Sequence, residues 1–276
     1  MNKFYGIISA VLGCMLLLSC DKEREPKVDP KLGIYLPVGS TSRDSYYNEI
    51  TDSTRHVYDN SGKLVQFIRS DGTSPGYPID LVYDNLGRVF KIMTAQRVLE
   101  QREYNVQGQL YKIHLYYNPD DVNFKSGEEI FGYDAAGKLI KIHSIRFDNR
   151  FGNPPYHTLN TFTYYAAGLI AIDSSFIAAE STGNGKPWYG GKIEYEYDAK
   201  KGVNEFGLSR DWRTGYVYLF SPLKHNITSI KETKNNGSVL QVTYQYEYNA
   251  HDYPIKISAF SDGRLGQTTR ITYQYF

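Results

Sequence analysis

A short element, Tyr-(Asp/Asn)-x-x-Gly-x-(Leu/Val), recurs along most of this chain and constrains its fold more than any other feature. Neighbouring copies lie 21 to 51 residues apart, and a period in this range is typical of proteins built from repeated structural units. The complete copies begin at Tyr58, Tyr83, Tyr104 and Tyr133, and the weaker copies begin at Tyr164, Tyr197 and Tyr248.

Each copy has the chemistry of a tight turn between two strands. Asp or Asn starts a turn by bonding to its own backbone, and Gly adopts the positive φ that a short connection requires. Apolar residues alternate with polar ones on both sides of the element, which indicates a β-hairpin. After the Gly, this alternation predicts that Phe90 and Ile92, Tyr111 and Ile113, and Ile140 and Ile142 share one face, with Lys91, Lys112 and Lys141 on the other.

The hairpins predict an all-β fold, an antiparallel up-and-down meander that forms a single domain over residues 34–276. Seven copies give about 14 strands, and more if Ile34–Val38 and Ile271–Phe276 pair at the two ends. An open twisted sheet of this size normally curls or closes. We therefore expect a strongly curved sheet or a barrel-like structure.

Residues 1–19 have the pattern of a secretory signal peptide. Lys3 precedes an apolar run, Phe4–Leu18, that is shorter than the roughly 20 residues of a membrane-spanning helix. The run ends in Leu17-Leu18-Ser19-Cys20, which resembles the lipobox of bacterial lipoproteins. That resemblance implies cleavage before Cys20 and acylation of Cys20, which would attach the protein to a membrane. Residues 20–33 are charged and contain Pro, so they are predicted to be a flexible tether.

Composition and motifs exclude several functions. The chain has 31 Lys+Arg against 30 Asp+Glu, without the basic excess that binding to nucleic acid requires. Cys14 leaves with the signal peptide and Cys20 is acylated, so no thiol remains for a disulfide, a metal or catalysis. Nucleophile-elbow, zinc-protease, P-loop and dinucleotide motifs are absent from the sequence. We expect no enzymatic activity, no cofactor and no metal centre.

Two groups of polar residues leave alternatives open. His114 and His143 each follow a repeat Gly by six residues, and two His on adjacent hairpins can bind a metal; a polar position on the strand is the favoured interpretation. Asp120-Asp121 and Glu128-Glu129 could supply the two carboxylates of a glycosidase. A solvated loop and a polar strand face explain these acidic pairs more simply.

The candidate ligand-binding residues are aromatic. Trp188 and Tyr189 lie in the Gly-rich stretch Gly183–Gly191, and Trp212 lies between Asp211 and Arg213; these segments are predicted to be loops. Aromatic side chains on loops of a rigid β-scaffold often stack on sugar rings or bind partner proteins. The alternative is that each Trp plugs an open end of the curved sheet.

The repeat resembles the YD repeat of bacterial Rhs and teneurin-type shells. It is also similar to a family of Gram-negative, gut-type lipoproteins of unknown function with a porin-like fold. The resemblance covers the chain from about Ser45 onward and implies architecture rather than chemistry. With the lipobox, it implies a lipoprotein of the cell envelope, most simply of the outer membrane, on its surface or its periplasmic side.

The sequence therefore predicts a non-catalytic, lipid-anchored envelope protein that binds glycan or a partner protein. The second hypothesis is a structural or interaction scaffold with a shell-like curved sheet. A transmembrane β-barrel is the third and least favoured hypothesis. Counting back by twos from Phe276 meets Gln274 and Thr272, whereas Tyr275 and Tyr273 fall on the other face.

Overall fold

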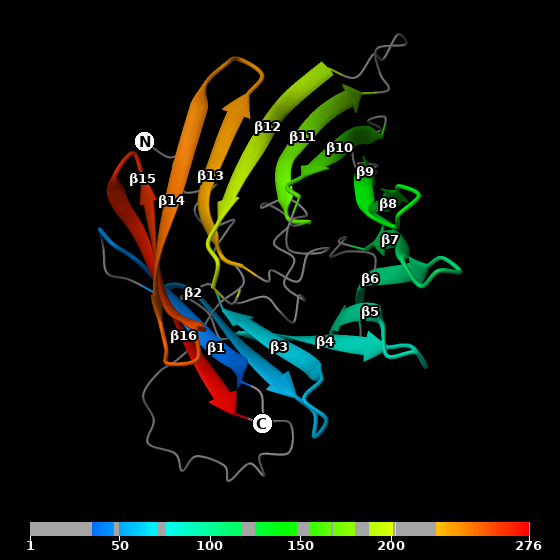
Figure 1. Ribbon diagram of the computed structural model, residues 1–276. Helices are drawn as coiled ribbons and strands as arrows, with labels where there is room; N and C mark the ends of the chain where they lie inside the picture. The colour runs from blue at the N-terminus through cyan, green and yellow to red at the C-terminus, as the bar shows by residue number, and fades with distance from the viewer. Residues whose placement is uncertain are drawn as a thin grey trace. The chain divides into compact units, whose positions relative to one another are not determined.

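The computed structural model describes residues 35–46, 50–70, 76–95, 97–116, 125–147, 155–166, 168–179, 188–200, 202 and 225–275. Within these ranges every regular element is a β-strand (Figure 1). No helix of the length and apolarity needed to cross a membrane occurs there. The strands are β1 (Tyr35–Asp44), β2 (Ile50–Tyr58), β3 (Leu64–Ser70), β4 (Tyr77–Tyr83), β5 (Val89–Thr94), β6 (Arg97–Tyr104), β7 (Leu110–Leu115), β8 (Gly127–Tyr133), β9 (Leu139–Arg146), β10 (Tyr156–Tyr164), β11 (Ile170–Ala179), β12 (Trp188–Tyr197), β13 (Ile227–Lys234), β14 (Val239–Tyr248), β15 (Pro254–Ser261) and β16 (Arg264–Tyr275).

The strands form an antiparallel meander whose hydrogen-bonded order closes on itself. Each strand neighbours the next along the chain, and β1 neighbours both β2 and β16. At the closing seam Tyr35 pairs with Tyr275, and Thr41 pairs with Arg270. The fold is thus an all-β closed barrel of 16 strands. This confirms the predicted antiparallel meander of hairpins, and of the curved sheet and the barrel that were expected, the structure shows the barrel.

The described residues fall into two compact units, neither of which is one continuous stretch of chain. The first unit comprises residues up to Ile79, Glu196–Ile230 and Gln241–Phe276; the second comprises Asp80–Tyr195 and Lys231–Leu240. Several strands, β4 among them, pass from one unit to the other. A single domain over residues 34–276 stays a prediction.

The repeat element forms the turn from each even-numbered strand to the next odd-numbered one. In the first copy the Asp59 carboxylate accepts hydrogen bonds from the backbone N–H groups of Ser61 (2.9 Å) and Lys63 (3.0 Å). Gly62 N–H donates to the Asp59 carbonyl at 3.0 Å, and Gly62 has a φ of 76°. Asp84, Asn105, Asp134 and Asn249 each accept the same two bonds from their own turns. The predicted role of Asp, Asn and Gly in the turn is confirmed.

A β-bulge follows the repeat turns, and it changes which residues after the turn face the core. Tyr133 pairs with Leu139 and Gly132 pairs with Lys141, so Ile140 is an extra residue without a cross-strand partner. Leu139 and Ile142 are buried, whereas Ile140 is 38% exposed. Phe90 and Tyr111 are skipped in the same way. The prediction that Phe90, Tyr111 and Ile140 share the buried face is therefore wrong, because the bulge shifts the alternation by one residue.

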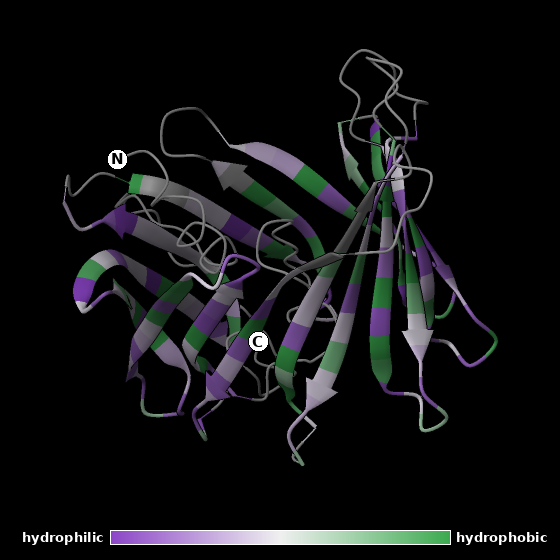
Figure 2. Ribbon diagram, turned by 90° about the horizontal axis from the view of Figure 1, so that it is seen from above, coloured by the Kyte–Doolittle hydropathy of each residue, from purple (hydrophilic) through white to green (hydrophobic). Residues whose placement is uncertain are grey.

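Beyond the bulges, the strands alternate between a buried face and a charged face, and Figure 2 shows the alternating hydropathy. Ile113, Phe131 and Ile142 belong to the buried face of the second unit, and Val242, Tyr244, Ile257 and Ile271 to that of the first. Cross-strand ion pairs lie on the charged face. Examples are Lys112–Glu128 (3.6 Å), Lys231–Glu194 (3.5 Å) and Lys256–Glu247 (2.5 Å).

A tyrosine near the end of an even-numbered strand donates its hydroxyl hydrogen bond to a backbone carbonyl of the preceding strand. Tyr133 bonds the carbonyl of Leu110, the first residue of β7, at 2.7 Å. Burial raises the pKa of Tyr133 to about 12, so its hydroxyl stays a neutral donor at physiological pH. We name these bonds tyrosine latches; the others are Tyr58–Pro37, Tyr104–Val89, Tyr164–Leu139, Tyr246–Ile227 and Tyr273–Pro254.

Removing one tyrosine latch is expected to destabilise the fold measurably. Tyr133→Phe keeps the ring and leaves the Leu110 carbonyl without its donor, so it should lower the free energy of unfolding by about 1 kcal/mol. Urea unfolding measures this change. The matched control is Tyr111→Phe, because Tyr111 is 46% exposed and its substitution should stay within about 0.5 kcal/mol of wild type. Equal effects of the two substitutions would contradict the latch.

Candidate functional site

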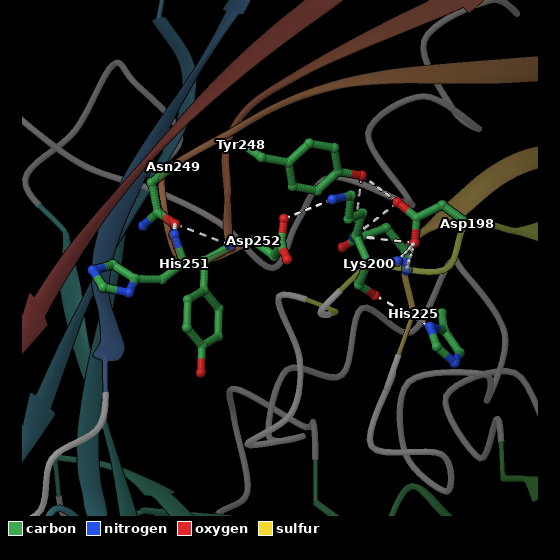
Figure 3. Close-up of polar contacts among 9 residues, drawn as sticks. Asp198, Lys200, His225, Tyr248, Asn249, His251 and Asp252 are labelled. Carbon is green, nitrogen blue, oxygen red and sulfur yellow. Dashed lines mark hydrogen bonds and ion pairs between the residues drawn. The ribbon is translucent and has the colours of Figure 1, made fainter.

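The repeat turn after β12 is opened by a long segment and still keeps the turn's hydrogen bonds. In the first copy Asp59 N–H donates to the Lys63 carbonyl at 2.8 Å; here Asp198 N–H donates to the Asn226 carbonyl at 2.9 Å. Asn226 thus takes the place of Lys63. Residues 199–225 stand where the first copy has residues 60–62. The residues around the two ends of this segment form the candidate site, which lies wholly in the first unit (Figure 3). They are Asp198, Lys200, Asn226, Tyr248 and Asp252, and we call them the base of the segment.

The Asp198 carboxylate is the centre of this site. It accepts hydrogen bonds from the backbone N–H groups of Lys200 (3.0 Å) and Asn226 (2.9 Å), as an ordinary repeat turn would supply. It also accepts the Asn226 side-chain amide at 3.1 Å and the hydroxyl of Tyr248. Asn226 is only 3% exposed. The carboxylate therefore joins both ends of the opened turn to strand β14.

Tyr248 has a different role from the other repeat tyrosines. Burial and the neighbouring Asp198 carboxylate raise the pKa of Tyr248 well above its ordinary value, so the hydroxyl is a donor and not a nucleophile. Its ring stacks on Tyr246 with centroids 5.9 Å apart. Tyr246 forms the latch of this strand, to the Ile227 carbonyl at 2.6 Å. On this strand Tyr246 therefore makes the latch, and Tyr248 donates its hydroxyl to Asp198 instead.

The rim of the site is polar and exposed. Lys200 Nζ lies 2.7 Å from a carboxylate oxygen of Asp252, and these side chains are 49% and 55% exposed. The Lys200 ammonium also lies 5.9 Å from the centre of the Tyr248 ring, and the Lys200 carbonyl lies 3.2 Å from His225 Nδ1. These contacts hold the two ends of the segment of residues 199–225 close together. The arrangement positions residues 199–225 and contains no pair of a nucleophile and a base among its described residues.

Asp252 occupies the position of the turn glycine and has a φ of 64°. Asp252→Gly and Asp252→Ala both remove the exposed ion pair to Lys200. Only the Ala variant keeps a Cβ in the left-handed region, which costs about 1 kcal/mol. We expect the Gly variant to have the higher free energy of unfolding by about that amount in urea. Equal stabilities would show that the turn does not depend on this conformation.

The buried face of the second unit contains ion pairs, which the alternation of apolar residues in the sequence does not predict. Glu100 and Arg102 are both buried and lie 3.2 Å apart on β6. Glu129 is fully buried and bonds Arg146 at 2.8 Å across the sheet. The Arg146 side chain lies against Gly127, where a Cβ would meet its Cδ at 3.2 Å. The Glu129–Arg146 pair holds β8 and β9 in register, because removing one partner leaves a buried charge.

Asp173 is the buried acid whose hydrogen bond comes from a neutral group. Its side chain is on β11, is 2% exposed and accepts the Asn160 amide at 2.8 Å. Burial raises the pKa of Asp173 to about 6, and the Asn160 bond offsets this only in part. The acid therefore ionises within the range of ordinary environmental pH.

This raised pKa predicts a pH-dependent stability with a definite sign. The folded protein holds the Asp173 proton more tightly than the unfolded chain does. The free energy of unfolding should therefore fall as pH rises from about 4 to about 6, and remain lower above that. Asp173→Asn removes this dependence, so its stability relative to wild type should improve by about 2 kcal/mol between pH 4.5 and pH 7.5. Urea unfolding at both pH values tests this; a constant difference would contradict the raised pKa.

The structure separates the two histidines that sequence spacing had grouped. His114 is on β7 and His143 is on β9, with β8 between them. Equivalent positions of consecutive hairpins are two strands apart, about 10 Å. His114 instead contacts Glu103 and lies 3.4 Å from Glu128. Among the described residues, no group of three or more His, Cys, Asp or Glu side chains is placed to hold a metal ion.

The acidic pairs and the aromatic candidates are placed as follows. Glu128 and Glu129 lie on opposite faces of β8, with Glu128 paired to Lys112 and Glu129 to Arg146. Adjacent carboxylates on opposite faces of one strand do not converge on a substrate. Asp120-Asp121 lie outside the described residues.

Trp188 and Tyr189 were predicted to lie in a loop, and this location is wrong. They begin strand β12, where Trp188 pairs with Ile177 and Tyr189 with Phe176 of β11. A Gly-rich stretch is typical of a loop when only its own residues are considered, but here pairing with β11 extends the strand into it. Trp212, Cys20, the signal peptide and the tether lie outside the described residues. Ligand binding by Trp188, Tyr189 and Trp212 stays a prediction.

Sequence analysis missed Asp198, Asn226 and Tyr248 as a group. The signal was present, because Tyr197-Asp198 begins a repeat whose Gly is missing and Asn226-Ile227 resembles its end. Asp173 was missed as well. It interrupts the apolar run that follows Gly168, at a position of the strand that is buried.

Comparisons with known proteins address the fold. A porin-like protein from Bacteroides vulgatus superposes with a TM-score of 0.55 at 13% sequence identity, over 88% of this chain and 100% of that one. The chain has a porin-like barrel fold. A porin-like protein from Bacteroides uniformis aligns over 85% of this chain and 96% of that one, at 11% identity and a TM-score of 0.35.

No protein-family model matches the chain. No curated protein matches it either.

Proposed function

We propose that the protein is a non-catalytic, lipid-anchored envelope protein that binds glycan through the segment of residues 199–225. One observation carries this proposal. The turn after β12 keeps the hydrogen bonds of a repeat turn, although residues 199–225 replace the short connection that other copies use. A scaffold that preserves its turn around a long segment has the usual arrangement of a binding loop on a rigid frame.

The composition of the segment favours a sugar as the ligand. Trp212 lies between Asp211 and Arg213, and Tyr216 follows four residues later. Aromatic rings stack on the apolar faces of sugar rings, and planar charged groups bond sugar hydroxyls. The exposed Lys200 and Asp252 at the base of the segment add polar groups beside it. Trp188 and Tyr189 remain secondary candidates for the same ligand.

The proposed location is the outer membrane, with attachment through acyl chains on Cys20 and the tether up to residue 33. A transmembrane barrel is the less favoured alternative. Transmembrane strands present an unbroken apolar band to lipid, whereas ion pairs such as Lys112–Glu128 and Lys256–Glu247 lie on the charged face of these strands. Burying such pairs in lipid would be costly.

The second candidate function is a structural or interaction scaffold. The buried face of each unit is packed with apolar side chains, hydroxyls and paired charges, among them Ile142, Thr269 and Glu129. A filled interior of this kind is what a scaffold requires. The segment of residues 199–225 would then contact a protein partner instead of a sugar.

Replacing the segment tests the proposed function directly. A variant in which residues 199–225 are replaced by Asn-Ser-Gly, the residues of the first turn, should have a free energy of unfolding no lower than wild type, because the strands and the turn are retained and the shorter connection costs less loop-closure entropy. Binding to a glycan array should be lost. Trp212→Ala should weaken the same binding by about 1–3 kcal/mol, the worth of one aromatic stacking contact.

Two further results separate the alternatives. Tyr77→Ala is the matched control, since Tyr77 is 53% exposed on β4 and lies far along the chain from the segment. If wild type binds no glycan and the shortened variant loses only a protein partner, the scaffold function is correct. If the shortened variant binds every ligand as wild type does, the segment is not the binding element.

A further inference from the structure

His143 and His157 bring two imidazole nitrogens together on adjacent strands of the second unit. His143 Nε2 lies 2.9 Å from His157 Nδ1, and the ring centroids are 5.1 Å apart with planes inclined by 28°. In the register of β9 and β10, His143 pairs with Leu159 and His157 pairs with Ile145. The two histidines are therefore diagonal neighbours on one face of the sheet.

This spacing matches two ligands in neighbouring positions around one metal ion. Imidazole nitrogens bind divalent transition metals at about 2.0–2.1 Å. Two such nitrogens at a right angle are about 2.9 Å apart, as in square-planar or tetragonal coordination, whereas tetrahedral ligands are farther apart, about 3.3–3.4 Å. The observed 2.9 Å corresponds to the right-angled case.

The surroundings keep the imidazoles available as ligands. A neutral imidazole carries one N–H group, so the two hydrogen-bonded nitrogens bind a metal together when the protons are on His143 Nδ1 and His157 Nε2. The Lys141 side chain lies against Gly132 of β8, where its Cε is 2.6 Å from the position of a Cβ. Strand β8 is on the opposite side of β9 from β10. The ammonium stem is thus directed away from His157.

We propose that His143 and His157 form a binding site for Cu²⁺, in which the two imidazoles occupy neighbouring positions of a tetragonal coordination sphere and water completes it. Tetragonal coordination by nitrogen and oxygen is the preference of Cu²⁺ and Ni²⁺, and Cu²⁺ binds a given set of ligands most tightly in its series. Two protein ligands are consistent with the finding that no described group of three is placed for a metal. The site does not depend on the proposed glycan binding.

A copper titration of the full chain, purified in detergent without an affinity tag, tests this site. Wild type should bind one Cu²⁺, more tightly than Ni²⁺ or Zn²⁺. Its electron paramagnetic resonance spectrum should show coupling to two nitrogen nuclei. His143→Ala and His157→Ala should each weaken Cu²⁺ binding at least about tenfold, because loss of an outer partner alone already costs about 10- to 100-fold.

His251→Ala is the matched control, because His251 lies on an exposed turn in the first unit and its removal should leave Cu²⁺ affinity unchanged. Thermal unfolding of each variant shows whether the fold is kept, and His157→Gln supplies a milder change if His157→Ala unfolds. Wild-type affinity in the folded His143 or His157 variants would overturn the proposal. Coupling to a single nitrogen, or no Cu²⁺ binding by wild type, would overturn it too.

Discussion

The hydrogen bond from a tyrosine hydroxyl to a backbone carbonyl is the interaction that links successive strands of this fold beyond their ladders. Tyr104, Tyr133 and Tyr164 reach the first residues of β5, β7 and β9. Those carbonyls lie beside a bulge, where the ladder is locally interrupted and a carbonyl needs another donor. Cations reinforce two of the rings, with Arg88 4.3 Å from the centre of Tyr104 and Lys138 4.5 Å from that of Tyr164. Among the described residues six tyrosines make this bond.

The sequence was sufficient to predict the hairpins and their turns, because turn chemistry and period-two alternation are local. It could not locate the bulges. Leu139 and Ile140 are both aliphatic, so nothing local shows which of them faces the core, and the answer comes from cross-strand register. The same limit hid the partner of His143. Repeat spacing compares His143 with His114, two strands away, whereas His157 lies on the next strand beyond a loop of variable length.

Buried charge has a different meaning at different sites of the second unit. Glu100 and Glu129 each face an arginine, so their charges are balanced. The Glu129 pair joins β8 to β9 and specifies their register at little net cost or gain. Asp173 faces the neutral Asn160, and the carboxyl group avoids the cost of burying a charge by keeping its proton up to a higher pH. An acid of this kind destabilises the fold above its own pKa. Burial beside a neutral partner thus makes Asp173 a position through which stability depends on pH.

The opened turn after β12 shows how such a scaffold gains a long segment without losing its register. Lengthening the connection from residues 60–62 to residues 199–225 is about three doublings, which costs about 2 kcal/mol of loop-closure entropy. In the second copy Arg88, at the position of Asn226, also donates from its side chain to the turn Asp. The Tyr248 hydroxyl adds a bond to the Asp198 carboxylate from strand β14. A hydrogen bond to a charged group contributes about 1.5–3 kcal/mol net of exchange with water. The Tyr248 bond is thus of the size needed to offset the longer connection. The repeat supplied the means, since its Asp already accepts two backbone bonds and needs only a new donor from β14.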